Sequence, residues 1–394
     1  MPPPPFTPPN SSPTTTGVEV TNPPQLSSIS NEPPNTEEIQ ISIQSLATSN
    51  ESNQPLEISG ERIDNLIQSS FEKVISDCIK KCITENISDP IEILRCAQKY
   101  IVQGRPLDII SSTDTVEGET NFIHVDRQGV LKSAFEEINL LENPRLTLEV
   151  SFYGELASDL GGPRKEFFML CLREIQSKYF DQGLRDYMST DYEAVGLIMG
   201  LSMLQNGCIP HFLTEEMIQE LFTSETPSQC IANLRAGFAK VGLIQIGREI
   251  PVFLNLLRQS STGILSRKKL ICLLKPSFSE EGSNSRQYEN TAYRAFSNYV
   301  RGVASGRRDG LTLGNILQFC TGTDKEPVLG FVVPPSIQFF TATSSSKWAF
   351  IPFANTCSQV MKLPTSSHGI SLPTEDELFE VYDYAFCNSY FGLA

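Results

Sequence analysis

The stretch Ile351-Pro352-Phe353-Ala354-Asn355-Thr356-Cys357 is the strongest signal in this chain of 394 residues. Leu363-Pro364 follows it, then an acidic segment that predicts a helix over 375–388, and the chain closes on Phe391-Gly392-Leu393-Ala394. The cysteine lies in a turn between two proline-bearing segments, whereas the other nine cysteines lie in helical or strand-like runs. Because a thiolate is a strong nucleophile, this setting predicts a reactive thiol at Cys357.

The composition narrows the classes of function. Hydrophobic residues make up 40% of the chain and charged residues 20%, which is enough for a large core. The net charge is −15, so we expect no nucleic-acid partner, because phosphate contacts need Lys and Arg. We find no run of 18 apolar residues and no signal peptide. We therefore expect no membrane partner and a cytoplasmic or nuclear protein.

Cysteine and histidine usage argues against a metal centre. The three histidines are too few for most zinc sites and most His-dependent catalysis; they are His124, His211 and His368. Cys78, Cys82 and Cys96 fall on apolar helix faces with no fourth ligand nearby in sequence, so we interpret them as buried core thiols. The scatter of all ten cysteines indicates reduced thiols rather than disulfides. We expect no metal and no cofactor.

The N-terminal segment 1–60 is predicted to be a disordered, acidic arm. It holds 12 of the 26 prolines, six Glu and no Lys or Arg. With so few apolar residues, burial cannot offset the entropy lost on ordering. Two short features, Pro2–Pro9 and Glu37–Ile43, suit a polyproline II ligand and an added β-strand, but ordinary linker sequence explains both as well.

Residues 61–104 predict a pair of amphipathic helices. Apolar residues from Ile63 to Ile83 recur at helical spacing, and Ser88-Asp89-Pro90 caps a second helix that stops at Gly104. The main body, 105–275, starts with the strand–helix–strand pattern 122–125, 130–141 and 146–152.

The turn Gly161-Gly162-Pro163 is predicted to start a helix. It lacks a third glycine and a Walker lysine, so we do not interpret it as a nucleotide-binding loop. We expect Asp159 and Glu155 to form a structural polar network with Arg164.

The polar stretch 276–290 is the best candidate for an internal linker, and 291–394 is predicted to be a separate, smaller unit. In that unit, helices are expected over 291–304 and 313–319, and strands over 328–333, 337–341 and 360–363.

The region 120–394 resembles a HECT-type ubiquitin ligase. That family has an active-site cysteine in the pattern Leu-Pro-x-(Ala/Ser)-His-Thr-Cys, with a proline seven residues later, and 351–357 with Pro364 is similar. Three further stretches match in order, namely 152–168, 317–331 and Phe391, four positions from the chain end.

The resemblance implies an α+β, bilobal fold with a mainly helical N-lobe at 105–275 and an α/β C-lobe at 291–394. It implies that Cys357 accepts ubiquitin from a conjugating enzyme as a thioester and passes it to a substrate lysine. Thr356 and Asn355 would support the thiol, and Phe391 would position the second step. The implied partners are ubiquitin, a ubiquitin-conjugating enzyme and a protein substrate.

The chain departs from the family pattern in three places. Asn355 stands where the family usually has histidine, and Ser358 replaces a usual aromatic residue. Fewer than 70 residues separate Cys208 from the predicted linker, so the N-lobe is shortened where the conjugating enzyme would dock. These departures leave open a second reading, a catalytically degenerate relative that binds ubiquitin or another partner without transferring it.

Overall fold

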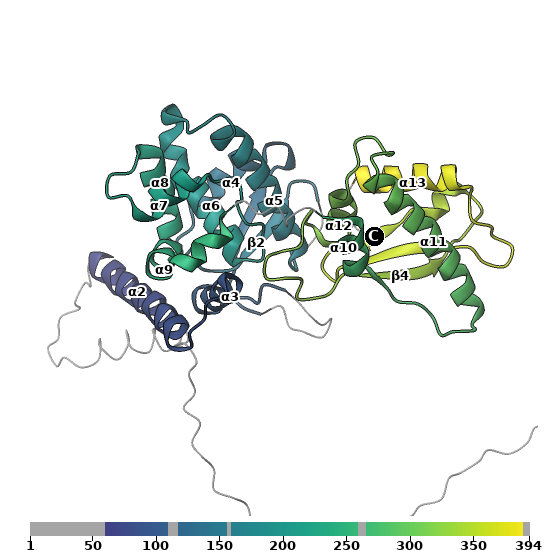
Figure 1. Cartoon of the computed structure of the whole chain (residues 1–394), viewed down its shortest axis with the longest axis horizontal. Coiled ribbons are helices and arrows are strands. Elements are labelled where there is room, and N and C mark those ends of the chain that lie inside the picture. Colours follow the sequence, from purple (N-terminus) through teal and green to yellow (C-terminus); the bar gives the residue numbers. More distant parts are fainter. Residues whose placement is uncertain (1–59, 109–116, 156–158, 259–264, 389–394) are drawn as a thin grey trace, which may run out of the picture. The chain divides into compact units, whose positions relative to one another are not determined.

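The computed structural model describes residues 60–108, 117–155, 159–258 and 265–388 (Figure 1). These residues form both helices and strands, with a long run of consecutive helices between β2 and β3, which confirms the α+β class. The predicted arm, apart from Gly60, and the predicted site residue Phe391 lie outside the described residues. No helix among the described residues combines the length and apolar character needed to cross a membrane.

The predicted helical pair is confirmed as α2 (Gly60–Thr84) and α3 (Pro90–Ile101). The Asp89 side chain accepts a hydrogen bond from the backbone N–H of Ile91, so it is the N-cap of α3. The pair belongs to the first of two hydrophobic clusters, because Phe71 and Ile75 on α2 are buried in it.

A two-stranded parallel sheet follows, in which β1 (Asn121–Val125) pairs with β2 (Leu148–Phe152). Helix α4 (Val130–Ile138) connects the strands and packs on β1. Helix α5 (Gly162–Ile175) begins at the predicted turn, where Gly161 has a φ of 115°, a conformation that glycine adopts without a steric penalty.

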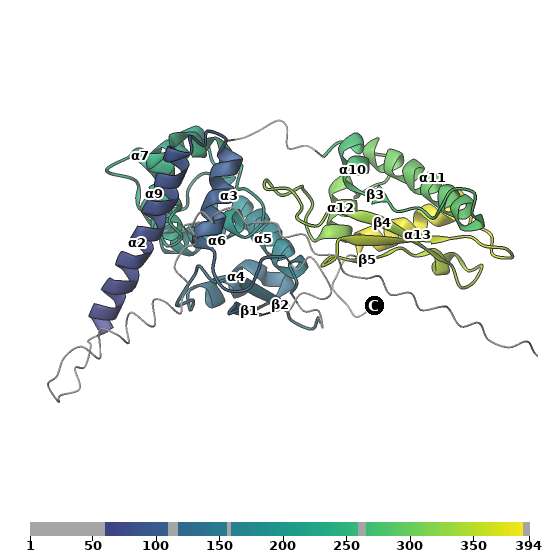
Figure 2. The same cartoon turned by 90° about the horizontal axis from the view of Figure 1, so that it is seen from below.

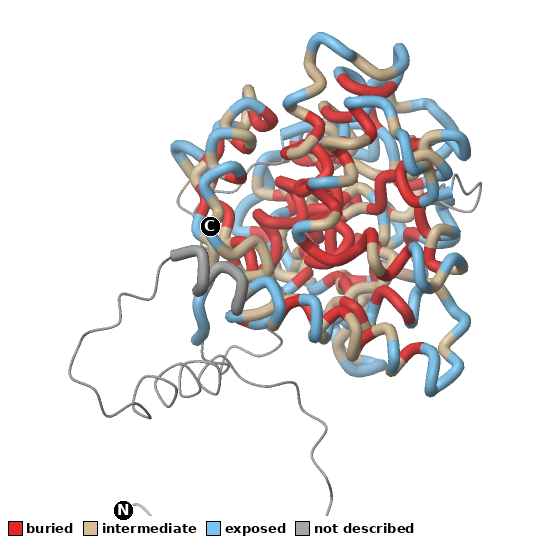
Figure 3. Tube along the Cα trace, turned by 90° about the vertical axis from the view of Figure 1, so that its left-hand side faces the viewer, coloured by how far each residue is buried: buried red, intermediate tan, exposed pale blue. Residues whose placement is uncertain are grey.

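Two closely packed helices form the centre of the first cluster. These are α6 (Tyr192–Leu204) and α8 (Gln229–Ala239). A Cβ at Gly196 would lie 2.2 Å from the carbonyl oxygen of Leu234, so only glycine permits this approach. The shorter helices around them are α7 (Glu215–Thr223) and α9 (Leu243–Glu249), with a 3₁₀ turn at Pro251–Leu256. Figure 3 shows the long buried stretches, in red, with exposed segments outside them.

The second hydrophobic cluster forms around a four-stranded sheet with the order β3-β4-β6-β5 (Figure 2). The strands are β3 (Lys275–Pro276), β4 (Ser336–Thr341), β5 (Phe353–Asn355) and β6 (Val360–Thr365). The first three in spatial order are parallel, and β5 runs antiparallel to β6 at the edge. The helices are α10 (Arg267–Leu273), α11 (Asn284–Ala304), α12 (Leu313–Thr321) and α13 (Glu375–Cys387).

The prediction of a linker over 276–290 is wrong. Helix α11 begins at Asn284, Pro276 is part of β3, and the ring of Phe278 stacks on Phe339. The buried residues of the first cluster end at Leu257 and those of the second begin at Leu270, so the change between clusters falls before the predicted segment.

The strand predicted over 328–333 is also absent, since those residues form turns and bends. Val328 and Leu329 instead pack against the first cluster. A short apolar run therefore marked a packing contact here rather than a strand.

Candidate functional site

The β5–β6 hairpin positions Cys357. Asn355 pairs with Val360 at the end of the ladder, which leaves the four residues Thr356 to Gln359 as the turn. Gln359 closes the turn with a φ of 55°, in the left-handed region that few non-glycine residues adopt. The reactive thiol predicted from sequence therefore lies at the tip of a tight hairpin at the sheet edge.

The side chain of Asn355 organises the backbone of this turn. Its Oδ1 accepts hydrogen bonds from the N–H groups of Cys357 and Ser358, both at 3.0 Å. An asparagine that accepts from the backbone two residues later forms an Asx turn. Asn355 thus acts on the conformation of the main chain around the thiol.

The sulfur of Cys357 is half-buried and interacts with the turn that precedes α5. Burial, which penalises the thiolate, raises the pKa of Cys357, and the charge of Asp159 adds to this rise. The backbone N–H groups of Leu160 and Gly162 favour the thiolate and lower the pKa of Cys357, as does the charge of Lys165. The net shift is upward, so the neutral thiol is favoured at rest.

Thr356 fills the space in front of Gly162. A Cβ on Gly162 would lie 2.3 Å from Oγ1 of Thr356, a separation that no real contact allows. Gly322, directly after α12, also lies close to Gly162, because a Cβ added to Gly322 would lie 2.7 Å from the carbonyl oxygen of Gly162. Three turns from distant parts of the sequence therefore meet at Gly162.

A buried polar network holds the turn before α5 in place. The carboxylate of Asp159 accepts hydrogen bonds from the N–H groups of Val150 and Gly161, at 2.9 and 2.8 Å. Behind it, Lys165 Nζ pairs with Asp108 Oδ1 at 2.6 Å, and both side chains are less than a tenth exposed. The N–H groups that face Cys357 are thus fixed by the first cluster.

The predicted pairing of Glu155 and Asp159 with Arg164 is corrected. Arg164 donates to the backbone carbonyls of Leu148 and Leu107. Glu155 pairs with Arg127 at 2.7 Å. Arg127 also pairs with Glu166, at 2.8 Å, and it lies far from both acids in sequence, so no local pattern signals this contact.

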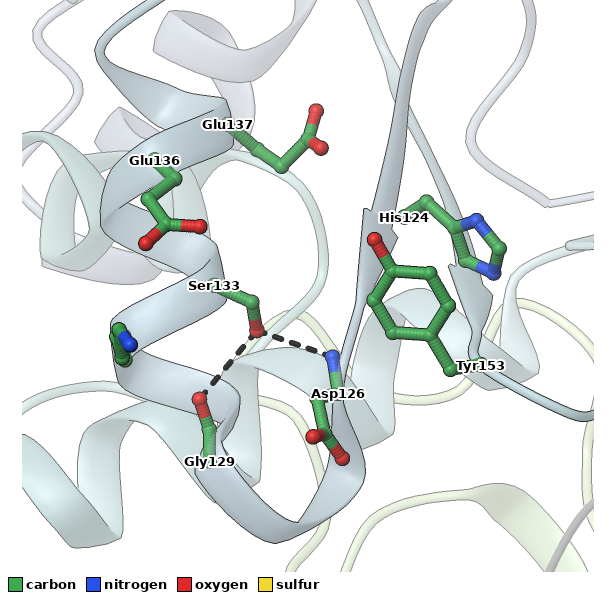
Figure 4. A pocket seen from close by; sticks show the side chains of 8 residues that line it. His124, Asp126, Gly129, Ser133, Glu136, Glu137 and Tyr153 are labelled. Carbon is green, nitrogen blue, oxygen red and sulfur yellow. Dashed lines mark hydrogen bonds between the residues drawn. The ribbon is translucent and has the colours of Figure 1, made fainter.

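Among the described residues, a polar cavity of about 240 Å³ lies between α4 and the ends of β1 and β2. Figure 4 shows His124 and Tyr153 on one side of it and Glu136 on the other; the two rings pack with centroids 3.9 Å apart. His124 therefore has a packing partner, in agreement with its interpretation as a structural residue. The lining includes none of the residues that interact with Cys357.

The structure brings Cys357, Thr356 and Asn355 together, and it adds Leu160, Gly162 and Lys165. Of these three, the sequence indicated a role only for Gly162, in starting a helix. The signal that was available is the pair of glycines at 161–162, since adjacent glycines permit close approach of another chain segment. The arrangement provides a nucleophile, fixed N–H donors beside it and partial exclusion of water. No protein-family model and no curated protein sequence matches this chain.

Proposed function

We propose that this protein is a HECT-type ubiquitin-protein transferase that carries ubiquitin as a thioester on Cys357. The observation that supports this most directly is the position of the thiol, at the tip of the β5–β6 turn, where the backbone N–H groups of Leu160 and Gly162 act on it. The residues around it are those of the family-like motif at 351–357. Free cysteines deep in a core, such as Cys320, lack this access.

The first step is thiol–thioester exchange, in which ubiquitin passes from the sulfur of the conjugating enzyme to that of Cys357. The thiolate of Cys357 attacks the carbonyl carbon of ubiquitin's C-terminal thioester on the conjugating enzyme. A new sulfur–carbon bond forms, and the sulfur of the conjugating enzyme leaves as a thiolate. The raised pKa of Cys357 lowers the fraction of the attacking thiolate in the resting protein.

The second step transfers the acyl group to a substrate lysine. The neutral amine attacks the same carbonyl carbon, the bond to Cys357 breaks, and the amine proton passes to solvent or a base supplied by the substrate complex. The N–H donors beside the sulfur stabilise the departing thiolate of Cys357. Asn355 keeps the turn in register, and Phe391 is assigned to positioning this step by the family resemblance alone.

The proposed partners are ubiquitin, a conjugating enzyme and a protein substrate, in the cytoplasm or nucleus. A second candidate function, binding of ubiquitin or another partner without transfer, is favoured by one observation. The burial that raises the pKa of Cys357 disfavours the thiolate that transfer requires.

Adduct formation separates the two candidates. The protein is incubated with activating enzyme, ubiquitin and a panel of conjugating enzymes, and the products are separated with and without reductant. We expect a reductant-sensitive ubiquitin adduct that is lost in Cys357→Ala and retained in Cys272→Ala, a control that removes an exposed cysteine elsewhere. If no adduct forms and the protein instead makes a stable complex with free ubiquitin, the proposed transfer is rejected in favour of binding without transfer.

A further inference from the structure

Three cysteines outside the proposed transfer site converge between α2 and α3. Cys78 and Cys82 lie four residues apart on α2, so they share one face of that helix, and Cys96 lies on α3. Their Sγ atoms all lie within 4.8 Å of one another. Sequence reasoning placed them in the core, and the structure adds that they meet at one point.

The spacing of the sulfurs matches metal coordination. The Sγ atoms of Cys78 and Cys96 are 3.8 Å apart. Zinc–sulfur bonds of about 2.3 Å in a tetrahedral site also separate neighbouring sulfurs by about 3.8 Å. A zinc ion would therefore need only small side-chain movements to contact all three.

Burial and charge also fit a divalent cation. Cys78 and Cys82 are buried and Cys96 is half-buried, which leaves one side of the cluster open for water as a fourth ligand. Three thiolates and one Zn²⁺ sum to a charge of −1, and the ammonium of Lys81 on α2 acts on Cys96 of α3. The thiol of Cys78 donates a hydrogen bond to the sulfur of Cys96, so the two sulfurs already face each other.

We propose that Cys78, Cys82 and Cys96 form a zinc site that joins α2 to α3. Three zinc–sulfur bonds form on binding, and the thiol protons pass to the buffer. The ion links two helices that otherwise meet through apolar side chains, and α2 in turn packs on α9. Zinc therefore stabilises the attachment of the helical pair to the rest of the first cluster, and the site is independent of ubiquitin transfer.

Cobalt substitution tests this in the full chain under a phosphine reductant. We expect one Co²⁺ per chain with the strong thiolate-to-cobalt charge-transfer absorption of a cysteine-rich site, and competition by Zn²⁺. Cys96→Ser is expected to weaken binding at least about tenfold, because loss of even an outer partner costs 10–100-fold. The matched control, Cys272→Ser, removes an exposed cysteine and is expected to change nothing.

A second measurement does not depend on the folding of a variant. In the wild-type protein, Zn²⁺ is expected to protect Cys96 from alkylation, as mapped by peptide mass spectrometry, and to leave Cys272 reactive. The proposal is overturned if Co²⁺ gives no charge-transfer band, if Cys96→Ser binds Co²⁺ as tightly as the wild-type protein does, or if Zn²⁺ leaves the alkylation of Cys96 unchanged.

Discussion

At the scale of single residues, the chemistry of the hairpin turn depends on opposing effects on one sulfur. Burial of Cys357 and the nearby carboxylate of Asp159 favour the neutral thiol, while Lys165 and two backbone N–H groups favour the thiolate. Burial is the largest of these effects. A partner that binds over the turn and brings a positive charge would therefore raise the thiolate fraction where transfer needs it.

Because the pKa of Cys357 is raised, we predict that its alkylation rate levels off at a higher pH than that of a free thiol. Because burial raises the pKa of Cys357, the rate of alkylation of Cys357 should still be rising with pH where that of a small-molecule thiol has levelled off. Peptide mass spectrometry of iodoacetamide-treated protein across pH measures this rate at Cys357 alone. A midpoint at or below that of the free thiol would contradict the desolvated setting.

The Asx turn at Asn355 predicts different outcomes for two substitutions. Asn355→Ala removes the acceptor of two backbone hydrogen bonds, so the free energy of unfolding should fall by about 1 kcal/mol. Asn355→Asp keeps an acceptor oxygen and should retain most of that stability. Urea unfolding measures the free energy of unfolding of both variants. Equal losses in the two would show that these hydrogen bonds contribute nothing to stability.

At the scale of elements, the candidate site is a contact between the β5–β6 hairpin and the N-terminus of α5. Gly162 permits this contact because it has no side chain. The hairpin supplies the thiol, and the turn before α5 supplies the N–H groups. Neither element makes the site alone.

Substitution at Gly162 is predicted to separate these two elements. In Gly162→Ala the new methyl group meets Thr356, so the turn must move away and Cys357 should become more exposed. We expect faster alkylation of Cys357 at a fixed pH and a loss of roughly 1–3 kcal/mol in unfolding free energy. Gly129→Ala is the control, because a Cβ there meets nothing within 4 Å. Equal effects in the two variants would refute a specific contact at Gly162.

Elements with local signals could be predicted from the sequence. Asp89 before Pro90 marked the start of α3, and Gly161-Gly162-Pro163 marked the start of α5. The first turns of α11 could not be predicted, because their polar composition resembled a linker. These turns are held by a contact with the segment just before the helix, in which the buried carboxylate of Glu289 accepts hydrogen bonds from Ser279.

The same limit applies to the candidate site. The motif around Cys357 was visible in one stretch of sequence, and so were Asn355 and Thr356. The N–H donors of Leu160 and Gly162 lie almost two hundred positions earlier in the printed sequence, and only folding brings them to the sulfur. The meeting of Cys96 with Cys78 likewise needs the packing of two helices.

At the scale of the whole molecule, one buried lysine connects distant segments. Lys165 on α5 pairs with Asp108, which follows α3, and Asp108 also accepts a hydrogen bond from Asn206, which follows α6. The side-chain amide of Gln359, in the Cys357 turn, has an orientation in which both its nitrogen and its oxygen are hydrogen-bonded. In that orientation the oxygen accepts a hydrogen bond from Lys165 Nζ at 3.2 Å. The network therefore links the first hydrophobic cluster to the hairpin of the second.

Removal of this lysine is predicted to be costly. Lys165→Met leaves Asp108 buried without its counter-ion, so the unfolding free energy should fall by about 3–5 kcal/mol. Lys80→Met, which breaks an ion pair on the exposed face of α2, should cost less than about 1 kcal/mol. Chemical denaturation measures both losses. Similar small losses would mean that the Lys165 network carries little of the stability.

The most direct test of the central claim, that Cys357 carries the acyl group, is the mass spectrum of a trapped intermediate. Cys357→Ser, incubated with activating enzyme, a productive conjugating enzyme and ubiquitin, should gain the mass of one ubiquitin. We predict an ester that resists thiol reductants, is cleaved by alkali and maps to residue 357. A reductant-sensitive adduct on another cysteine, or an adduct whose site is not residue 357, would contradict it.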